Sequence, residues 1–473
     1  MARLEPAQRQ RWDLLAPYAE ALAAPAAQRR LWAWTALAVS SLALAGVMAL
    51  LLAVSRLPGI DKTFPWPLQF FQKGLVVHVV FSFAVWFLAV FGAILHVATQ
   101  RLAGGRPCAE PLAAGPWAAA AAFVLLFVPA LLDRGQPTLN NYIPVIVDPL
   151  YYAGLGFLGI GVLMAATRLL MALLFARQGP FEPVARSALA GAAIYLLALG
   201  SIALAFRSLG GQTPSFDFNE NLFWGGGHVL QFLNLTLMLA AWYVLGGLAF
   251  GRPALSPGLF SILLTFAVVG ALVGFAVQAT MEPFSATQRE TFTWLQYALA
   301  PSPVIAVAAG FGVARAWFRE NVADAWRHPA FLALVLSIAT FGIGGTLGIF
   351  VDGADTRTPA HYHGVIGGIN LAFMGLMFAF VLPLLARAPK AGRAIRVQIW
   401  LYAVGQILAC IGLFWAGGYG AARKTVGAAQ DLSHVGATIG LYLNGIGALI
   451  AIVGGVMFIW TVGRALLRRP VRE

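Results

Sequence analysis

Long apolar runs constrain this chain of 473 residues more than any other feature. Each run holds about 18 residues or more, which is enough for a helix to cross roughly 30 Å of hydrocarbon. Hydrophobic residues make up 60% of the sequence and charged residues only 10%. We therefore predict an all-α, polytopic membrane protein built as a bundle of twelve transmembrane helices. The predicted spans are 31–55, 73–100, 116–133, 149–176, 187–206, 222–250, 257–280, 291–317, 329–351, 361–386, 396–417 and 436–467.

The segments between these spans are short, so no soluble domain is expected between them. Residues 1–30 form an Arg-rich N-terminal segment without the short apolar core of a cleaved signal. Residues 31–467 form the helical domain, and residues 468–473 a short tail.

The formal net charge of +13 is explained by lipid contact rather than by nucleic acid. With the N-terminus placed in the cytoplasm, about two thirds of the 31 Lys and Arg residues fall on the cytoplasmic side. The positive-inside rule then predicts that both termini are cytoplasmic, in a membrane of the bacterial inner (plasma) membrane type. No nucleic-acid partner is expected.

Two histidines, His361 and His363, open the predicted span 361–386. Side chains two residues apart on a helix point about 200° apart, so this helix presents an imidazole to each side. Ionisable groups at membrane depth are costly and usually functional, and two neutral imidazoles placed back to back suit the axial ligation of two haems. The alternative is a pair of buried polar side chains with local hydrogen bonds.

The depth of the histidines favours the haem interpretation. His78 and His228 lie near the outer starts of the spans 73–100 and 222–250, both of which run inward like the span of His361 and His363. Four of the seven histidines therefore converge on the outer third of the membrane from three helices. One buried cofactor site requires this arrangement.

The remaining histidines and both cysteines are not expected to hold a cofactor. His96 and His328 fall on the inner side and are interpreted as interfacial residues. His434 is predicted to be a loop or helix-start residue. Cys108 lies in an inner loop and Cys410 inside a span, so no disulfide joins them.

Twelve spans with His78, His228 and the pair His361 and His363 at these positions resemble the large subunit of the haem-copper oxidase superfamily. That superfamily includes the terminal oxidases and the respiratory nitric oxide reductases. The resemblance implies that His78 and His363 clamp a low-spin haem, closed to ligands. It implies that His361 holds a high-spin haem with one face open to a small gas. Both haems are expected to be b-type by default.

A basic pair in the loop before the last span extends the resemblance. Arg423 and Lys424 resemble the residues that hold the haem propionates in that family. The alternative is an ordinary solvated pair in a loop.

The chain departs from the family at the second metal, which faces the high-spin haem. The resemblance supplies His228 as one ligand, but Gln278 and Ala279 stand where an adjacent histidine pair is expected. Phe232 replaces the oxidase tyrosine one turn after His228, and no glutamate stands there as in nitric oxide reductases. One histidine is a poor basis for a copper site.

A second interpretation is a weaker distal metal site with nitrogen and oxygen ligands instead of three histidines. Gln278 and Glu282 are four residues apart and would share a helix face, so with His228 they would form a site more suited to iron than to copper. The alternative is that Glu282, beside Pro283, only begins an outer loop.

Glycines near the candidate ligands permit close approaches. The run Gly225–Gly227 either admits a haem or another helix close to the backbone or simply weakens that helical turn, and approach to the haem pocket is favoured. Gly364, Gly367 and Gly368 are expected to serve helix packing.

The predicted function is that of a respiratory membrane enzyme, a terminal reductase that passes electrons from the low-spin to the high-spin haem, where a small gas is reduced. His361 and His228 are its candidate catalytic residues. The inner halves of the spans hold few carboxylates, which argues against a proton pump and favours NO over O₂ as the substrate. Two alternatives are a homologue altered towards electron transfer or gas sensing and a transporter or structural bundle without haem.

The electron donor must come from outside the chain. The sequence holds neither a CxxCH motif for covalent haem nor a copper-binding domain. We expect a donor subunit, a soluble cytochrome or copper protein, or quinol, and we expect the chain to be part of a multi-subunit complex.

Overall fold

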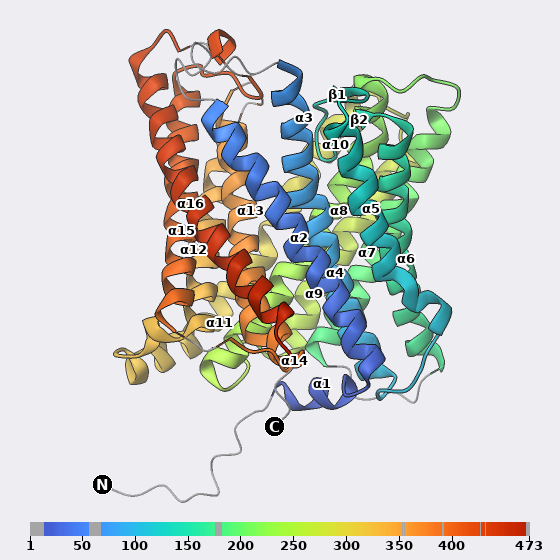
Figure 1. Cartoon of the computed structure of the whole chain (residues 1–473), viewed down its shortest axis with the longest axis vertical. Coiled ribbons are helices and arrows are strands. Elements are labelled where there is room, and N and C mark those ends of the chain that lie inside the picture. Colours follow the sequence, from blue (N-terminus) through green and yellow to red (C-terminus); the bar gives the residue numbers. More distant parts are fainter. Residues whose placement is uncertain are drawn as a thin grey trace, which may run out of the picture.

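The computed structural model describes residues 14–55, 68–175, 182–351, 353, 355–389, 392–425, 427–430 and 432–469. Within these ranges, twelve helices are long and apolar enough to cross a membrane, so the predicted number of spans is confirmed. Each observed helix overlaps the predicted span, and the helices run side by side along one direction (Figure 1). Parts of the predicted N-terminal segment and tail, residues 1–13 and 470–473, lie outside the described residues.

Several spans consist of more than one helical segment. The short helix α1 (Ala16–Ala21) precedes them, and the 3₁₀ turns η6 (Ala325–Arg327) and η8 (Gly427–Gln430) lie in loops. The spans are α2 (Pro25–Ser55); α3 (Leu68–Val79), η3 (Val80–Val85) and α4 (Trp86–Leu102); η4 (Glu110–Ala114) and α5 (Gly115–Leu131); α6 (Pro149–Phe175); α7 (Pro183–Ser208); α8 (Phe216–Phe250); α9 (Pro257–Thr280); α10 (Ala286–Leu295), η5 (Gln296–Leu299) and α11 (Pro301–Asn321); α12 (Pro329–Gly348); α13 (Arg357–Leu376), η7 (Met377–Val381) and α14 (Leu382–Leu384); α15 (Arg393–Gly418); and α16 (Val435–Leu467).

Helix α8 begins six residues before its predicted start, because a serine caps it. The Ser215 side chain accepts a hydrogen bond from the Phe218 amide at 3.1 Å, which satisfies one of the N–H groups that a helix start leaves unpaired. Hydropathy alone does not detect such a cap. The added turns bring Asn219 and Glu220 onto the helix.

Helices α8 and α13 form the centre of the bundle. Their apolar windows are 94% and 83% buried, more than those of any other span. Polar contacts join the central helices to their neighbours: Trp86 on α4 donates to the Asn370 side chain on α13 at 2.9 Å, and Asn370 donates to the Tyr402 hydroxyl on α15 at 2.9 Å. In a bundle whose surroundings are as apolar as its core, such contacts fix which helices are neighbours.

The predicted packing role of the glycines on α13 is confirmed. A Cβ added to Gly364 would lie 2.5 Å from the Gly344 Cα on α12, a distance that real side chains do not reach. A Cβ on Gly368 would lie 2.6 Å from Phe341 on α12, whereas one on Gly367 would lie 3.2 Å from the Gln406 side chain on α15. Small residues here let α12 and α13 approach backbone to backbone.

A two-stranded hairpin, which the sequence did not predict, lies in the connection between α5 and α6. Strand β1 (Gln136–Thr138) pairs antiparallel with β2 (Val145–Val147), with Thr138 opposite Val145. The hairpin lies at one end of the bundle beside α10, and α1 lies at the other end (Figure 1). We call these the hairpin end and the α1 end.

Two spans contain a turn of π-helix, η3 and η7. The first begins two residues after His78, in the middle of its span. A π-turn inserts one extra residue into an α-helix and re-aims the side chains on either side of it, and such turns are frequent at functional sites. The position of η3 therefore draws attention to His78.

Candidate functional site

His361, in the second turn of α13, is oriented by a backbone carbonyl of α12. Its Nδ1 lies 2.8 Å from the Gly344 oxygen. A carbonyl only accepts, so Nδ1 carries the hydrogen and Nε2 is left as the basic atom of the ring. Gly348 makes room for the imidazole, because a Cβ there would lie 2.4 Å from His361 Nδ1.

His78, on α3, has the same arrangement. Its Nδ1 lies 3.0 Å from the carbonyl oxygen of Ala45 on α2, which fixes the same tautomer and leaves Nε2 basic. Histidines that ligate metals are commonly oriented by such a bond from the other ring nitrogen. Both side chains are partly buried.

His363 follows His361 by two residues on α13 and is also partly buried. Its ring lies 5.1 Å from that of Tyr362, centroid to centroid. On a helix the two histidines point to different sides, as the sequence predicts.

Residues that fit haem ligation are accompanied by polar atoms that lack a protein partner. Thr358 Oγ1, three residues before His361, and Trp224 Nε1, four before His228, are buried and have no hydrogen-bond partner among the described residues. Such atoms are rare in folded proteins, and a bound water or ligand is one way to satisfy them. The histidine and polar side chains at the hairpin end therefore fit bound haem.

His228 is 2% exposed, and both of its ring nitrogens are engaged. Nδ1 lies 2.8 Å from the Trp224 carbonyl one turn earlier, so Nδ1 carries the hydrogen. Nε2 is then an acceptor, and it lies 2.8 Å from Tyr142 Oη and 3.1 Å from Gln296 Nε2. The lone pair that a metal ion would need is occupied by these donors. We call Tyr142, His228 and Gln296 the Tyr142 cluster.

The weaker metal site considered from the sequence is not assembled. Helix α9 ends at Thr280 and Met281 is extended, so Glu282 does not share a helix face with Gln278, and the expectation of a common face is wrong. Glu282 is exposed, whereas the Gln278 amide oxygen is buried against Gly225. In the described part of the chain, no three His, Cys, Asp or Glu side chains are grouped to hold a metal ion. These donors do not fit a distal metal.

The glycine run Gly225–Gly227 admits side chains from other parts of the bundle. A Cβ on Gly225 would meet Gln278, one on Gly226 would meet Ile202, and one on Gly227 would lie 2.4 Å from Tyr142 Cγ. Close approach is thus confirmed, but the approaching groups are protein side chains.

Tyr142 is the main site residue that the sequence did not reveal. It lies between the two strands of the hairpin with φ of 62°, a left-handed conformation that costs a non-glycine residue free energy. Burial, and secondarily the Glu220 carboxylate, raise the pKa of Tyr142 above its ordinary value, so the phenol stays protonated. The Asn140-Asn141 pair before it is a turn signal, although it does not say where the turn docks.

Contacts with α8 and with the loop of Lys424 hold the hairpin in place. The Glu220 carboxylate accepts from the backbone N–H of Asn141 at 2.6 Å and from its side-chain amide at 2.7 Å. Asn219 donates to Thr138 Oγ1 at 3.1 Å. The Lys424 ammonium donates to the Leu139 carbonyl.

The basic pair Arg423 and Lys424 therefore lies at the hairpin end, where Lys424 contacts the hairpin at Leu139, and both side chains are partly buried. Burial, and then the charge of Arg423, lower the pKa of Lys424 from 10.5 to about 8, against an opposing effect of Glu220. A carboxylate bound beside Lys424 would stabilise its charged form and so raise its pKa again.

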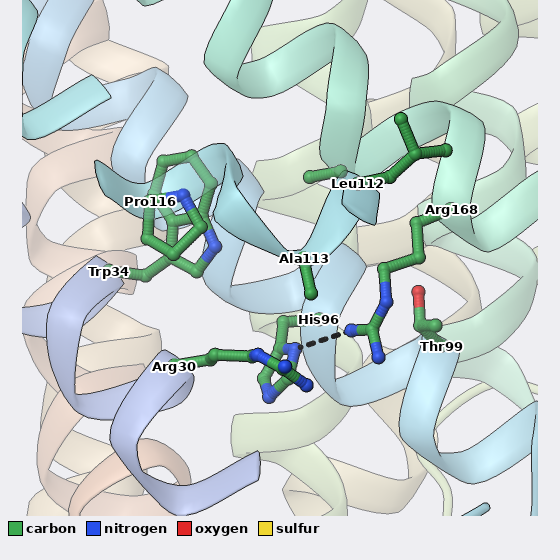
Figure 2. A pocket seen from close by; sticks show the side chains of 9 residues that line it. Arg30, Trp34, His96, Thr99, Leu112, Ala113, Pro116 and Arg168 are labelled. Carbon is green, nitrogen blue, oxygen red and sulfur yellow. Dashed lines mark hydrogen bonds between the residues drawn. The ribbon is translucent and has the colours of Figure 1, made fainter. Parts of the chain in front are cut away.

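His96 belongs to a separate cluster at the α1 end, shown in Figure 2. Its Nε2 donates to the Ala27 carbonyl at 2.9 Å, and its Nδ1 lies 3.4 Å from Arg168 Nη1. Arg168 and Arg30 both bind the Glu110 carboxylate, at 3.1 and 2.5 Å. With both nitrogens engaged, His96 is not available as a haem ligand.

The other histidines and the cysteines have structural roles. His328 and His434 are the N-cap residues of α12 and α16, so the predicted helix-start role of His434 is confirmed. Cys108 and Cys410 are both free thiols, as expected.

Comparisons with known proteins agree with this geometry. Residues 29–450 match the family described as cytochrome c and quinol oxidase polypeptide I. An uncharacterized protein of Aquifex aeolicus is 28% identical over 74% of this chain and 83% of its own length. Another of Rickettsia prowazekii is 24% identical over 92% and 95%. Cytochrome c oxidase subunit 1 of Thermus thermophilus is 25% identical over 88% and 80%.

Among solved structures, a chain from the cryo-EM structure of a heme-copper terminal oxidase dimer superposes with a TM-score of 0.80. The match covers 95% of this chain and 86% of that one, at 16% sequence identity. At that identity the likeness concerns the fold.

Proposed function

Because its residues 29–450 match the family model over most of its length, this chain belongs to the cytochrome c and quinol oxidase polypeptide I family, and we propose that it is the haem-binding subunit of a membrane oxidoreductase that acts on a small gas. The observation that carries the proposal is the matched orientation of His78 and His361, each with Nδ1 on a backbone carbonyl and Nε2 left basic. Such imidazoles are suited to axial ligation of iron.

In this proposal His78 and His363 hold a low-spin haem and His361 holds a second haem that has one open face. The haems supply the electron transfer and the gas binding when they are bound. The chain's own residues orient the imidazoles, exclude water through the apolar helices around them, and place Arg423 and Lys424 at the same end to hold propionates. Electrons enter from a partner subunit, a soluble donor or quinol.

NO is the favoured substrate over O₂. The inner halves of the spans hold few carboxylates, which supports proton supply from the hairpin end rather than pumping. The absence of a fitting distal metal supports a second candidate, in which the chain binds a gas or passes electrons without reducing the gas. NO and O₂ consumption by the purified complex distinguishes these candidates.

The test is the absorbance difference between the dithionite-reduced protein with and without CO, scaled to total haem. We expect a CO shift in about half of the haem, because one of two haems has an open face. The His361→Ala variant should lose the CO-sensitive haem, whereas His78→Ala should lose the CO-insensitive one. His434→Asn is the matched control, since it changes a histidine at the same end and keeps a good N-cap residue.

Haem without any CO shift would reject gas chemistry and leave electron transfer alone. Purified, folded protein that takes up no haem would reject the proposed function altogether.

A further inference from the structure

The sequence assigns His228 to a distal metal, whereas the structure engages its basic nitrogen with two protein donors. We propose that the Tyr142 cluster replaces the distal metal in this chain: Tyr142 and Gln296 hold His228 as a hydrogen-bond acceptor, and the site works without a second metal ion. This inference rests on the proposed function, because it concerns a ligand of the metal that would face the second haem.

The first argument is the tautomer of His228. The Trp224 carbonyl fixes the hydrogen on Nδ1, so Nε2 has a single lone pair. Tyr142 Oη at 2.8 Å and Gln296 Nε2 at 3.1 Å both point a donor at this lone pair. A metal ion on Nε2 would have to displace both side chains.

The second argument is that contacts of neighbouring residues hold Tyr142 in its position. Its left-handed backbone is costly, and it is held by the contacts of Asn141 with the buried Glu220 carboxylate. Gly227 lacks the Cβ that would strike the Tyr142 ring. The Asn141 contacts and the missing Cβ of Gly227 together fix the position of Tyr142 against His228.

The third argument is the lack of further ligands. Gln278, which stands where a ligand is expected, has its amide oxygen packed against Gly225, and the exposed Glu282 lies beyond the end of α9. Across the described ranges, no group of His, Cys, Asp or Glu side chains is arranged around a metal position. Copper and iron both need several such donors.

The role that this assigns to Tyr142 is positioning. The phenol holds the His228 ring in one orientation, and Gln296, on the 3₁₀ turn η5 between α10 and α11, holds it from another element. The cluster joins the hairpin, α8 and η5, and its polar groups are the neutral phenol of Tyr142, the neutral imidazole of His228 and the amide of Gln296, packed beside the Trp224 and Phe292 rings. A small, uncharged gas fits such surroundings better than an ion does.

The experiment combines metal analysis with a double-mutant cycle on the full-length protein. Copper, zinc and non-haem iron are measured per chain, before and after incubation with copper(II) or iron(II) and desalting. The wild type and His228→Leu should contain equally little of these metals. One metal ion per chain that disappears in His228→Leu would overturn the inference.

The cycle uses Tyr142→Phe, His228→Leu and the double variant, with melting temperature as the readout. Tyr142→Phe should lower the melting temperature by about 1–2 °C, and His228→Leu by more, because it also removes the contacts with Trp224 and Gln296. The double variant should fall no further than His228→Leu, because the bond between Tyr142 and His228 is already lost there. Additive shifts would show that the two side chains do not interact. Tyr297→Phe, at an exposed tyrosine next to Gln296, is the control and should leave the melting temperature unchanged.

Haem content and the CO spectrum of the same preparations separate the two hypotheses. Lack of haem rejects the proposed function, while the cycle still reports on the Tyr142 cluster. Haem with a normal CO shift together with a His228-dependent metal rejects only the inference.

Discussion

Two of the candidate haem ligands, His78 and His361, take their orientation from a neighbouring helix. His361 uses a carbonyl of α12 and His78 a carbonyl of α2, and both of those helices lack the side-chain carboxylate that often orients such a ring. A carbonyl acceptor keeps the site uncharged, which suits a low-dielectric interior. The sequence gives the imidazoles and their depth, whereas the carbonyl partners depend on how the helices dock.

Gly227→Ala tests whether the glycine run exists for Tyr142. A Cβ there would lie 2.4 Å from the Tyr142 ring, so the variant should lose about 1–3 kcal/mol of stability through overpacking. The free energy of unfolding or the melting temperature measures this loss. Gly455→Ala on α16 is the control, because nothing lies within 4 Å of a Cβ there and an alanine favours a helix.

The effect of Gly227→Ala should shrink in a Tyr142→Gly background, where the ring is gone. An equal loss in both backgrounds would mean that some other neighbour meets the added methyl group.

The lowered pKa of Lys424 predicts that the stability of the haem-free protein depends on pH. Its folded-state pKa of about 8 lies below the ordinary 10.5, so the unfolded chain binds the extra proton between these values. Stability should therefore rise with pH from about 8 to 10.5, relative to a Lys424→Met variant that lacks this titration. Thermal melts across that range give the difference, and a constant difference would contradict the lowered pKa.

Among individual residues, sequence patterns identify those that are out of place in a membrane. Histidines at matching depth are detectable because ionisable groups are rare there. Tyr142 is an ordinary loop tyrosine in the sequence, and only the docking of the hairpin onto α8 reveals its contact with His228. Glu282 fails as a ligand because an i, i+4 argument needs a helix that continues, and α9 stops at Thr280.

At the scale of elements, the hairpin is the part that the sequence did not predict. Its strands have three residues each and contain no long alternating pattern, so the signal is too short to detect. Hydrogen bonds from Asn141 to the Glu220 carboxylate hold the hairpin against α8.

Glu220→Gln should loosen the hairpin. The amide of glutamine offers one oxygen where the carboxylate accepts two hydrogen bonds from Asn141, so one donor loses its partner. Hydrogen–deuterium exchange of residues 136–147 should become faster by about tenfold, which corresponds to roughly 1.4 kcal/mol. Asp217→Asn, at an exposed acid one turn earlier, is the control.

Unchanged exchange in Glu220→Gln would assign the hold on the hairpin to its other contacts, with Asn219 and Lys424.

For the whole molecule, the sequence predicts the twelve spans because membrane thickness dictates their length. It does not predict which helices are central. Burial of α8 and α13 follows from contacts between remote segments, such as the bond from Trp86 to Asn370. Hydrophobicity cannot distinguish a helix that faces lipid from one that faces other helices, since both surroundings are apolar.

The α1 end of the bundle depends on Arg168, which joins α4, η4 and α6. Its guanidinium contacts the Cys108 carbonyl, Glu110 and His96. Arg168→Met should destabilise the protein by about 2–3 kcal/mol, less than a fully buried pair because the Glu110 side chain is 45% exposed. Resistance to thermal unfolding measures this loss, and Arg106→Met at an exposed loop position is the control.

If Arg168→Met and Arg106→Met melt alike, Arg30 alone holds Glu110, and the network at this end is not cooperative.

The small cavity beside His96 has a consequence for energy storage. Its volume of about 10 Å³ leaves room for no more than one water molecule, beside the hydrogen bond between His96 and Arg168 (Figure 2). A cavity of this size is not by itself a water-filled path from the α1 end, and in the proposed function the protons consumed at the hairpin end would come from that side and cross only a small part of the bilayer. Little charge would be separated across the membrane, so the free energy of the reaction would be released as heat instead of being stored as a voltage.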